Sequence, residues 1–482
     1  MQYPKKILHW VNDTEIEGHS KDFFSKLNPA NEQKLADVAS GTQADVESAV
    51  ESAVAAFDIW HSKPVVERAN ILQSAAKLLE EKKSELAEII SQECGKSLTD
   101  ALGEINAAIE CGRFIAEQTQ SFAPEFIKSK NPGRTVFLTR NPVGVAALIV
   151  PFNNPAASLA WKIFPALFCG NTVVIKAHED TPYVAVWFAK IFKEAGLPNG
   201  VISVVQGLGQ EVGAALVADS RVDLISFTGS VQTGRLIIKN SADRLAKVSI
   251  EAGGKNPLVI CDDADIDLAV ATSIQSAFVD GGQRCAAASR IVIFESVYEQ
   301  FKEKFLSAVK QLVVGVAPGA NYGAIINERR LNQILGFVSR AREQGIKILA
   351  GGNRISGTGF FMEPTVLEGA RLEDEISCFE VFGPVVNLYQ VKDLTEAIRV
   401  SNATPFGLSG AIHTKDPDRV QKFVAGYHSG VVRVNGPTHG SEPHMPFGGV
   451  KLSGNGWREP GLKAFDFYTD WRQVSIDNQK YE

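Results

Sequence analysis

The fold is decided by five short apolar runs: VGVAALIV (143–150), TVVIKA (172–177), VISVVQ (201–206), DLISFTG (223–229) and AKVSIEAGG (246–254). They are rich in β-branched residues, nearly continuous and short, which is typical of strands buried on both faces of a parallel sheet. Segments with helical character separate them, at 155–169, 182–195, 209–219 and 230–242. This alternation predicts a doubly wound α/β unit.

The sequence on either side extends this unit. Residues 42–120 have apolar residues at helical spacing behind Thr42, a candidate N-cap, and they predict helices. A second alternating series begins at PLVICDDADID (257–267), runs past Leu408 and predicts another α/β domain.

The aromatic, alternating tail FDFYTDWRQVSID (465–477) predicts a strand, and RTVFLTR (134–140) is its expected mate. Two isolated strands are marginally stable. We therefore expect this ribbon to need a partner surface, most simply another subunit.

The composition indicates an ordinary globular enzyme. The 482 residues are 45% apolar and 22% charged, with a net charge of −6, which gives no basic surface for nucleic acid. The most apolar stretch, 143–175, contains Asn, Lys and Pro residues and is not expected to span a membrane. The six cysteines are scattered, without metal-site spacing, and no secretory signal is visible, so we expect reduced thiols, no metal site and a cytoplasmic location.

Three segments carry residues suited to acyl chemistry. Cys285 lies among small residues in GGQRCAAASR (281–290), where it is either a nucleophile or a buried structural cysteine. Glu251 ends a predicted strand and faces the ligand crevice, or is a solvated loop glutamate or a helix cap. Asn153, in PFNNP (151–155), can donate to an oxyanion or simply form a turn.

Two further segments suit a nucleotide. SFTGSVQTG (226–234) predicts a strand, then Gly229, then a helix whose free N–H groups face an anion. VIKAHE (174–179) places Lys176 and Glu179 just past a strand end, where a glutamate can bind ribose hydroxyls. A plain turn and a surface charge pair are the respective alternatives.

Taken together, seven motifs in one order resemble the aldehyde dehydrogenase superfamily from about residue 20 to the C-terminus: PFNNP, VIKAHE, SFTGS, EAGGK, GGQRC, EVFGP (380–384) and PFGGVKLSGNGWREPG (446–461). The resemblance implies a cofactor-binding domain (1–123 and 143–250) and a catalytic domain (251–450). It also implies an oligomerisation ribbon and tail (124–142 and 451–482), and hence a homodimer or homotetramer.

The resemblance also implies the roles. Cys285 matches the nucleophile, Glu251 the general base, and Asn153, with the backbone N–H of Cys285, the oxyanion donor. The expected reaction oxidises an aldehyde to a carboxylate through a thiohemiacetal and a thioester on Cys285, with no metal. Phe152, where the family usually has Trp, and Ala252, where it often has Leu, remove no catalytic group.

The cofactor implied is NAD. Lys176 and Glu179 match the adenosine-ribose contacts, and Ser230, after Gly229, begins the pyrophosphate site. Glu380 matches the nicotinamide-ribose ligand, and Phe382 is expected near the nicotinamide. The family uses no glycine fingerprint for this cofactor, and none is found here. NADP is less favoured, because Glu179 would repel its 2′-phosphate.

The substrate is less defined. Arg284 either clamps a substrate carboxylate or pairs within the protein. Phe447 is the expected aromatic wall of the loop 435–449, whose polar candidates, His439, Glu442 and His444, either contact substrate or only line a solvated loop. GNGWREPG resembles branches that act on semialdehydes. A CoA-acylating semialdehyde dehydrogenase is the alternative enzyme, and an inactive nucleotide-binding structural protein is the alternative of another class.

Overall fold

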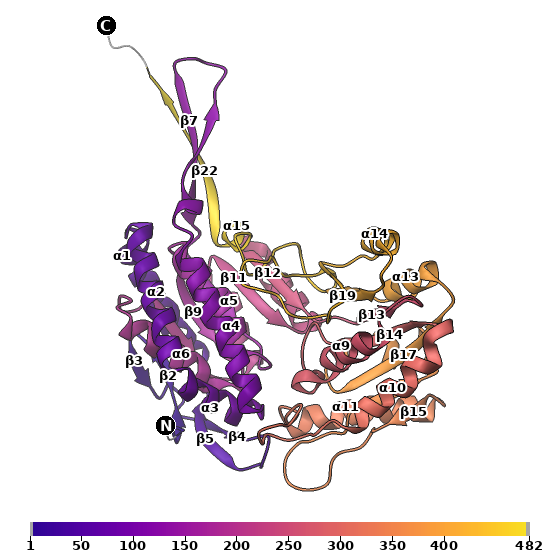
Figure 1. Ribbon diagram of the computed structural model, residues 1–482. Coiled ribbons are helices and arrows are strands. Elements are labelled where there is room, and N and C mark those ends of the chain that lie inside the picture. The colour runs from indigo at the N-terminus through magenta and orange to yellow at the C-terminus, as the bar shows by residue number, and fades with distance from the viewer. Residues whose placement is uncertain (1–2, 479–482) are drawn as a thin grey trace.

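The computed structural model describes residues 3–478, and two seven-stranded sheets dominate it (Figure 1). The five apolar runs form parallel strands of the first sheet, as predicted. These are β8 (Val145–Ile149), β9 (Thr172–Lys176), β10 (Ile202–Val205), β11 (Leu224–Gly229) and β12 (Lys247–Ala252). Antiparallel strands β2 (His9–Val11) and β3 (Thr14–Ile16), which the sequence analysis did not predict, extend the sheet beyond β10.

Helices cover both faces of this sheet. The expected crossover segments form α5 (Pro155–Phe168), α6 (Pro182–Glu194), a π-helical turn (Gly209–Gly213) leading into α7 (Ala214–Ala218), and α8 (Val231–Ser241). The segment 42–120 forms α1 (Gln43–His61), α2 (Val65–Glu81), α3 (Lys83–Cys94) and α4 (Leu98–Ala116). One apolar core joins α2–α6 to one face of the sheet, and another joins α1, α7 and α8 to the other face. The sheet is therefore doubly wound.

Thr42 begins α1 as expected. Its N–H donates to the carboxylate of Asp45 at 2.7 Å, in a capping-box arrangement.

The order of the strands in the first sheet indicates where a ligand-binding crevice lies. In the order β12-β11-β8-β9-β10, β9 lies on one side of β8 and β11 on the other. The direction of winding therefore reverses beside β8. Ligands of open α/β sheets bind outside the carboxyl ends of the strands at such a reversal. The loop that carries Asn153 leaves the sheet at this point.

The second sheet has the order β15-β16-β17-β14-β13-β19-β20. Its parallel strands are β13 (Asn256–Ile260), β14 (Ala288–Phe294), β16 (Thr365–Glu368), β17 (Val385–Val391), β19 (Ser409–His413) and β20 (Val431–Val434), with antiparallel β15 (Lys347–Ala350) at one edge. Its main helices are α9 (Ile266–Phe278), α10 (Tyr298–Lys310), α11 (Glu328–Glu343), α13 (Leu394–Asn402) and α14 (Pro417–Gly426). Only residues 253–255 separate β12 of the first sheet from β13 of the second.

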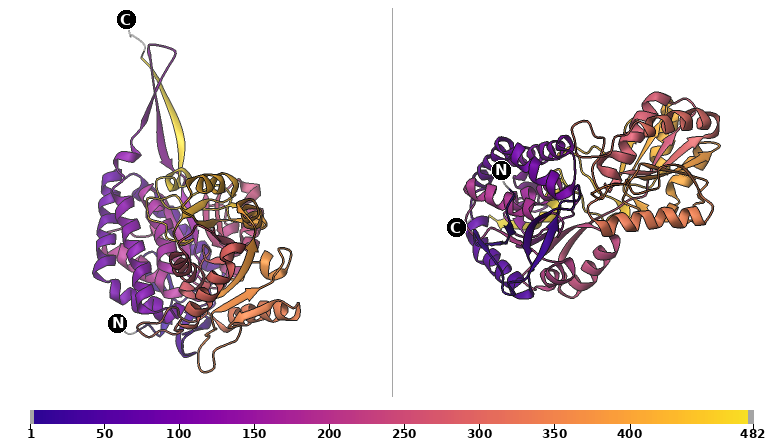
Figure 2. Two further views of the ribbon diagram at one scale, coloured as in Figure 1. Left: turned by 45° about the vertical axis from the view of Figure 1, so that its right-hand side comes forward. Right: turned by 90° about the horizontal axis from the view of Figure 1, so that it is seen from below.

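The expected ribbon projects away from the body of the molecule (Figures 1 and 2). β7 (Arg134–Pro142) pairs along its whole length with antiparallel β22 (Thr469–Asp477). A third strand that was not predicted, β6 (Glu125–Lys128), pairs with the other edge of β7.

The tail prediction was wrong at its start. Residues Ala464–Tyr468 form the short helix α15, so the strand begins at Thr469 and not at residue 465. Phe465, Phe467 and Tyr468 are all buried, and a helical turn packs such closely spaced aromatics into one core, whereas a strand would alternate them between faces.

The remaining strands are short. β1 (Lys6–Ile7), β5 (Lys34–Ala39) and β4 (Phe23–Leu27) form a small sheet, and β18 (Phe406–Gly407) pairs with β21 (Val450–Lys451). Within residues 3–478, no helix is long and apolar enough to cross a membrane.

Candidate active site

The predicted reacting groups lie where the carboxyl end of the first sheet meets the amino end of the second. Asn153 follows β8 and Glu251 lies near the end of β12, whereas Cys285 comes just before β14. Asn153 lines a small cavity with Gln283, two residues before Cys285. Cys285 packs against the apolar cluster that contains Phe447, and a Cβ on the next residue, Gly448, would lie 2.7 Å from Glu251 Oε1, so Glu251 lies beside the same segment as Cys285. The structure therefore brings all three together.

The loop before Cys285 is sharply bent and tightly held. Asp280, Gly281 and Gly282 have φ values of 55°, 62° and 66°, in the left-handed region that favours glycine. A Cβ on Gly282 would lie 2.2 Å from the carbonyl oxygen of Gly383. The side chain of Asn256 donates to the carbonyls of Cys285 at 2.8 Å and Ala287 at 2.9 Å. These contacts fix the position of the nucleophile loop.

The thiol is protonated at neutral pH in this environment. Burial raises the pKa of Cys285 to about 12, and the carboxylates of Glu251 and Glu380 add to the rise. The backbone N–H of Ala286 and the charge of Arg284 act in the opposite direction. A nucleophile of this kind needs a base or an added positive charge to ionise.

Glu251 has the environment of a general base. The residue is 6% exposed, and its Oε1 has no hydrogen-bond partner among the described residues. Burial and then the charge of Glu459 raise its pKa well above the usual value, against the opposing charges of Lys162 and Arg458. A buried carboxyl with a raised pKa in a crevice is typical of acid–base catalysts.

The motif PFGGVKLSGNGWREPG closes the free edge of β12. The N–H of Ile250 donates to the side chain of Asn455 at 2.9 Å, and the N–H of Ala252 donates to the carbonyl of Ser453 at 2.9 Å. The motif also supplies Glu459, whose buried carboxylate accepts from Lys162 at 2.8 Å. The sequence analysis missed this buried ion pair beside Glu251, because its partners lie far apart in the chain.

On the cofactor side, Lys176 and Glu179 form an ion pair of 3.1 Å at the end of β9. The side chain of Lys176 is 4% exposed and that of Glu179 is 25% exposed. Burial alone would raise the pKa of Glu179, but the charges of His178 and Lys176 lower it to about 2. Glu179 is thus an ionised carboxylate that is paired on one side and still open to solvent.

The segment SFTGS forms the expected strand, turn and helix. β11 ends at Gly229, and Ser230 caps α8 by accepting from the N–H of Thr233 at 3.2 Å. A Cβ on Gly229 would lie 2.5 Å from the ring of Phe227. The first turn of α8 presents backbone N–H groups, the donors that phosphate oxygens require.

The EVFGP loop precedes β17 and reaches across to the first sheet. Glu380 accepts from the N–H of Gly254 at 3.2 Å, and a Cβ on Gly253 would lie 1.9 Å from Glu380 Oε2. Burial raises the pKa of Glu380 to about 7. Phe382 packs against Phe152, with ring centroids 5.8 Å apart. Two carboxylates for ribose hydroxyls and a helix N-terminus for phosphates together fit a dinucleotide.

Arg284 pairs within the protein, which was one of the two alternatives that the sequence left open. Its Nε donates to the carboxylate of Asp280, and its Nη1 lies 3.4 Å from Nδ1 of His439. Burial lowers the pKa of His439 to about 4, so the neutral ring accepts this contact. The Arg284 side chain remains 25% exposed. Its Nε and Nη1 are therefore engaged within the protein, while part of the side chain stays exposed.

The candidate substrate wall packs beside the nucleophile. Phe447 forms a small apolar cluster with Ala286 and Leu408, and Cys285 and Trp161 pack against it. The rings of Phe447 and Trp161 are 5.5 Å apart. Glu442 and His444 lie on an exposed part of the loop, 3.8 Å from each other, with 60% and 52% of their side chains exposed.

Comparisons with known proteins identify the family. The family model described as "Aldehyde dehydrogenase family" matches residues 16–474. A 2,5-dioxopentanoate dehydrogenase from Saccharolobus solfataricus is 36% identical over 97% of this chain and 99% of its own length. An alpha-ketoglutarate semialdehyde dehydrogenase from Haloferax volcanii is 37% identical over 96% and 97% of the two chains.

Among solved structures, a betaine aldehyde dehydrogenase from Staphylococcus aureus in complex with NAD+ superposes with a TM-score of 0.95. It is 30% identical and covers 98% of this chain and 96% of its own. Both the family model and these relatives span nearly the whole sequence. The chain therefore belongs to the aldehyde dehydrogenase family and is an aldehyde-oxidising oxidoreductase.

Proposed function

We propose that this enzyme oxidises a short semialdehyde bearing a carboxylate to the corresponding dicarboxylate, with NAD as the hydride acceptor. The observation that carries the substrate class is Arg284, a partly exposed guanidinium next to the nucleophile. The positive charge of its exposed part suits a carboxylate at the far end of the substrate. The printed names of two relatives, 2,5-dioxopentanoate and alpha-ketoglutarate semialdehyde dehydrogenase, support a substrate of this class.

The reaction begins at Cys285. Its thiol first gives its proton to solvent, and the thiolate then attacks the aldehyde carbon. The oxyanion that forms accepts from the amide of Asn153 and the backbone N–H of Cys285. One such donor is typically worth about 3–4 kcal/mol of barrier. Phe447 and its apolar neighbours shield the carbon chain of the substrate, next to its aldehyde group, from water. A bound NAD would supply the hydride acceptor for the tetrahedral carbon, and loss of the hydride would leave a thioester on Cys285.

Glu251 completes the cycle by taking a proton from a water molecule that attacks the thioester. The carboxylate product and the Cys285 thiol are released. The presence of Glu251 disfavours the CoA-acylating alternative, because a thiol as incoming nucleophile does not need this base.

The proposed cofactor-binding site lies along the carboxyl ends of the strands of the first sheet. Glu179 would accept from the adenosine ribose, with Lys176 beside it, and Glu380 would accept from the nicotinamide ribose. Gly229, Ser230 and the first turn of α8 would hold the pyrophosphate, and Phe382 would pack near the nicotinamide. The chemistry of this donor set fits NAD better than NADP, because the exposed side of Glu179 is anionic.

We also propose that the ribbon joins two copies of the chain and that the enzyme is a cytoplasmic homodimer or a dimer of dimers. Phe126 is 77% exposed and Trp471 is 43% exposed on this projecting element, an exposure expected of residues that a partner covers. All six cysteines are free thiols, which supports a reducing compartment.

The test is NADH formation with a panel of aldehydes, with and without CoA. Acidic semialdehydes should give the highest kcat/KM, and CoA should yield no acyl-CoA. Cys285→Ser should abolish turnover while NAD binding persists. A Cys285→Ser variant with wild-type rates would refute the mechanism, and equal kcat/KM for acidic and neutral aldehydes of the same length would refute the substrate class.

A further inference from the structure

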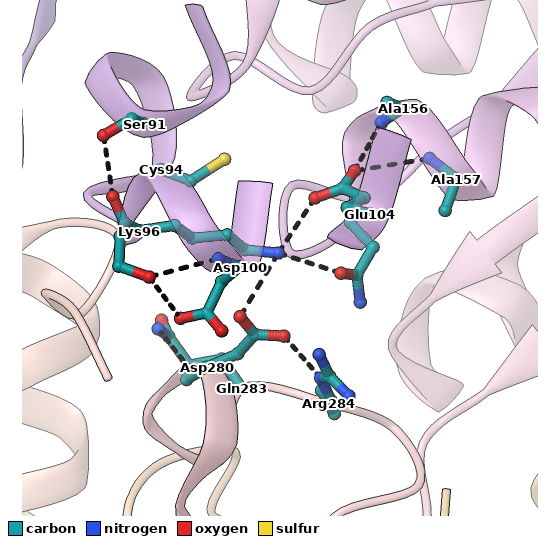
Figure 3. Close-up of polar contacts among 12 residues, drawn as sticks. Ser91, Cys94, Lys96, Asp100, Glu104, Ala156, Ala157, Asp280, Gln283 and Arg284 are labelled. Atoms are coloured by element: carbon teal, nitrogen blue, oxygen red, sulfur yellow. Dashed lines mark hydrogen bonds and ion pairs between the residues drawn. The ribbon is translucent and has the colours of Figure 1, made fainter. Parts of the chain in front are cut away.

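A cluster of buried charges lies beside the nucleophile loop and ends at Arg284, the proposed substrate-binding residue; its other members have no role above (Figure 3). Lys96 follows the left-handed Gly95 that ends α3, and it is 6% exposed. Its Nζ lies 2.9 Å from Glu104 Oε2 and 3.5 Å from Asp280 Oδ1. The other oxygen of Asp280 accepts from Nε of Arg284. Two cations and two carboxylates thus alternate along this chain of contacts.

One end of the cluster holds the loop of the oxyanion donor. Lys96 Nζ donates to Oδ1 of Asn154 at 2.8 Å, and Asn154 is the residue after Asn153. Glu104 accepts from the N–H groups of Ala156 at 2.7 Å and Ala157 at 3.3 Å, in the first turn of α5 (Figure 3). These contacts to Asn154, Ala156 and Ala157 therefore fix the position of the loop that carries Asn153.

The other end holds the loop of the nucleophile. Asp280 begins the left-handed bend, and its partner Arg284 immediately precedes Cys285. Asn153, Lys96 and Asp280 line one cavity of about 10 Å³, so the two loops face each other closely around the ammonium.

We propose that Lys96 is a positioning residue whose ammonium ties the Asn153 loop to the Cys285 loop and sets the spacing of oxyanion donor and nucleophile. This inference rests on the proposed roles of Asn153 and Cys285. Removing the ammonium leaves the carboxylates of Glu104 and Asp280 buried with less compensation, a strongly unfavourable arrangement that the loops relieve by moving. A displacement of about 1 Å at reacting groups can cost about 100-fold in rate.

The primary test replaces Lys96 with Met, which keeps an unbranched side chain, one atom shorter, and removes its charge. Single-turnover hydride transfer should slow by about 10- to 100-fold, while NAD affinity stays near that of wild type. Lys96→Arg should restore most of the rate, because it retains a cation with several donors. A Lys96→Met enzyme with the wild-type single-turnover rate would overturn the proposal.

A matched control is Arg68→Met. Arg68 is another buried cation, 5% exposed, but it lies at the opposite end of α5, where it donates to the carbonyls of Phe168 at 3.0 Å and His61 at 3.2 Å. This change should lower the thermal midpoint and leave hydride transfer unaffected. An equal loss of rate in Arg68→Met and Lys96→Met would show a general effect of lost stability and would overturn the positioning role.

A double-mutant cycle asks whether Lys96 acts through Asn153. Asn153→Ala alone should cost about 100- to 1,000-fold in kcat. In that background Lys96→Met should cost little more, because the donor that it positions is absent. Full multiplication of the two effects would overturn the proposal.

Two further variants keep the test decisive. If Lys96→Met does not fold, Glu104→Gln is tested in its place. Gln keeps an acceptor for the N–H of Ala156 but weakens the ion pair with Lys96, so hydride transfer should slow by a smaller factor. An unchanged rate of hydride transfer would overturn the proposal. Cys285→Ser tests the proposed function separately, since turnover at the wild-type rate in that variant would refute the mechanism. The Lys96 variants are judged against the rate of the wild-type enzyme.

Discussion

Replacing Glu179 with Ser should weaken the use of NAD and relax discrimination against NADP. Glu179 is ionised at every working pH, since the charges of His178 and Lys176 bring its pKa to about 2 despite its burial. A charge-assisted hydrogen bond to a ribose hydroxyl is worth about 1.5–3 kcal/mol. At about 1.4 kcal/mol for each tenfold change, kcat/KM for NAD should fall by roughly 10- to 150-fold.

The structure adds a second effect on NADP. In the wild type, the Glu179 carboxylate engages Lys176 Nζ at 3.1 Å and would face a 2′-phosphate with like charge. In Glu179→Ser the carboxylate is gone and the ammonium of Lys176 is free to approach the phosphate. The ratio of kcat/KM for NAD to that for NADP should therefore fall by at least about tenfold.

The assay is kcat/KM for both cofactors, measured with one aldehyde for wild type, Glu179→Ser and Glu179→Gln. Gln retains length and an acceptor oxygen without the charge, so it should lie between the other two. Thermal midpoints check that each variant is folded. An unchanged NAD:NADP ratio in a folded Glu179→Ser enzyme would mean that Glu179 only neutralises Lys176 and does not contact the ribose.

Three other predictions concern the base, the thiol and the ribbon. Glu251→Gln should keep a burst of about one NADH per site and slow steady turnover by about 100- to 10,000-fold, since the base acts after hydride transfer; loss of the burst with substrate and NAD still bound would place Glu251 earlier. Without cofactor, alkylation of Cys285 by iodoacetamide, followed by mass spectrometry, should accelerate about tenfold per pH unit from pH 7 to 10, because the thiolate fraction rises toward a pKa of about 12; a plateau below pH 9 would contradict this. Light scattering at micromolar concentration should give a dimer or tetramer, and a monomer would refute the role of the ribbon.

The residues that could be found from the sequence are those at strand ends. Glu251 and Lys176 lie on buried runs that are unmistakable as strands, and parallel strands carry such residues to one edge of a sheet. Asn153 follows a third run. Glu380 and Phe382 could be found only through the family motif EVFGP. They lie in the loop before β17, and no apolar periodicity in the sequence points to them.

The groups that sequence reasoning missed act through contacts between distant segments. Asn256 holds the carbonyls of Cys285 and Ala287, and Lys96 meets Asp280 across the interface of the two sheets. Asp280, directly before the two glycines of GGQRC, was the one visible signal of a partner for Arg284. The short strand β6 was missed for the same reason, since it is defined by its pairing with β7.

The arrangement of charges around Cys285 bears on the order of events. Burial and two carboxylates hold the thiol protonated, and the neighbouring cation, Arg284, is already neutralised by Asp280. Asp280 in turn keeps its charge, because Arg284 and Lys96 hold its pKa at about 2 in spite of its burial. The protein therefore supplies little net positive charge to stabilise a thiolate. In the oxidised cofactor the nicotinamide ring carries a positive charge, and a cation beside a thiol lowers its pKa. The thiol should consequently become a good nucleophile only in the presence of NAD, so that cofactor binding precedes productive attack on the aldehyde.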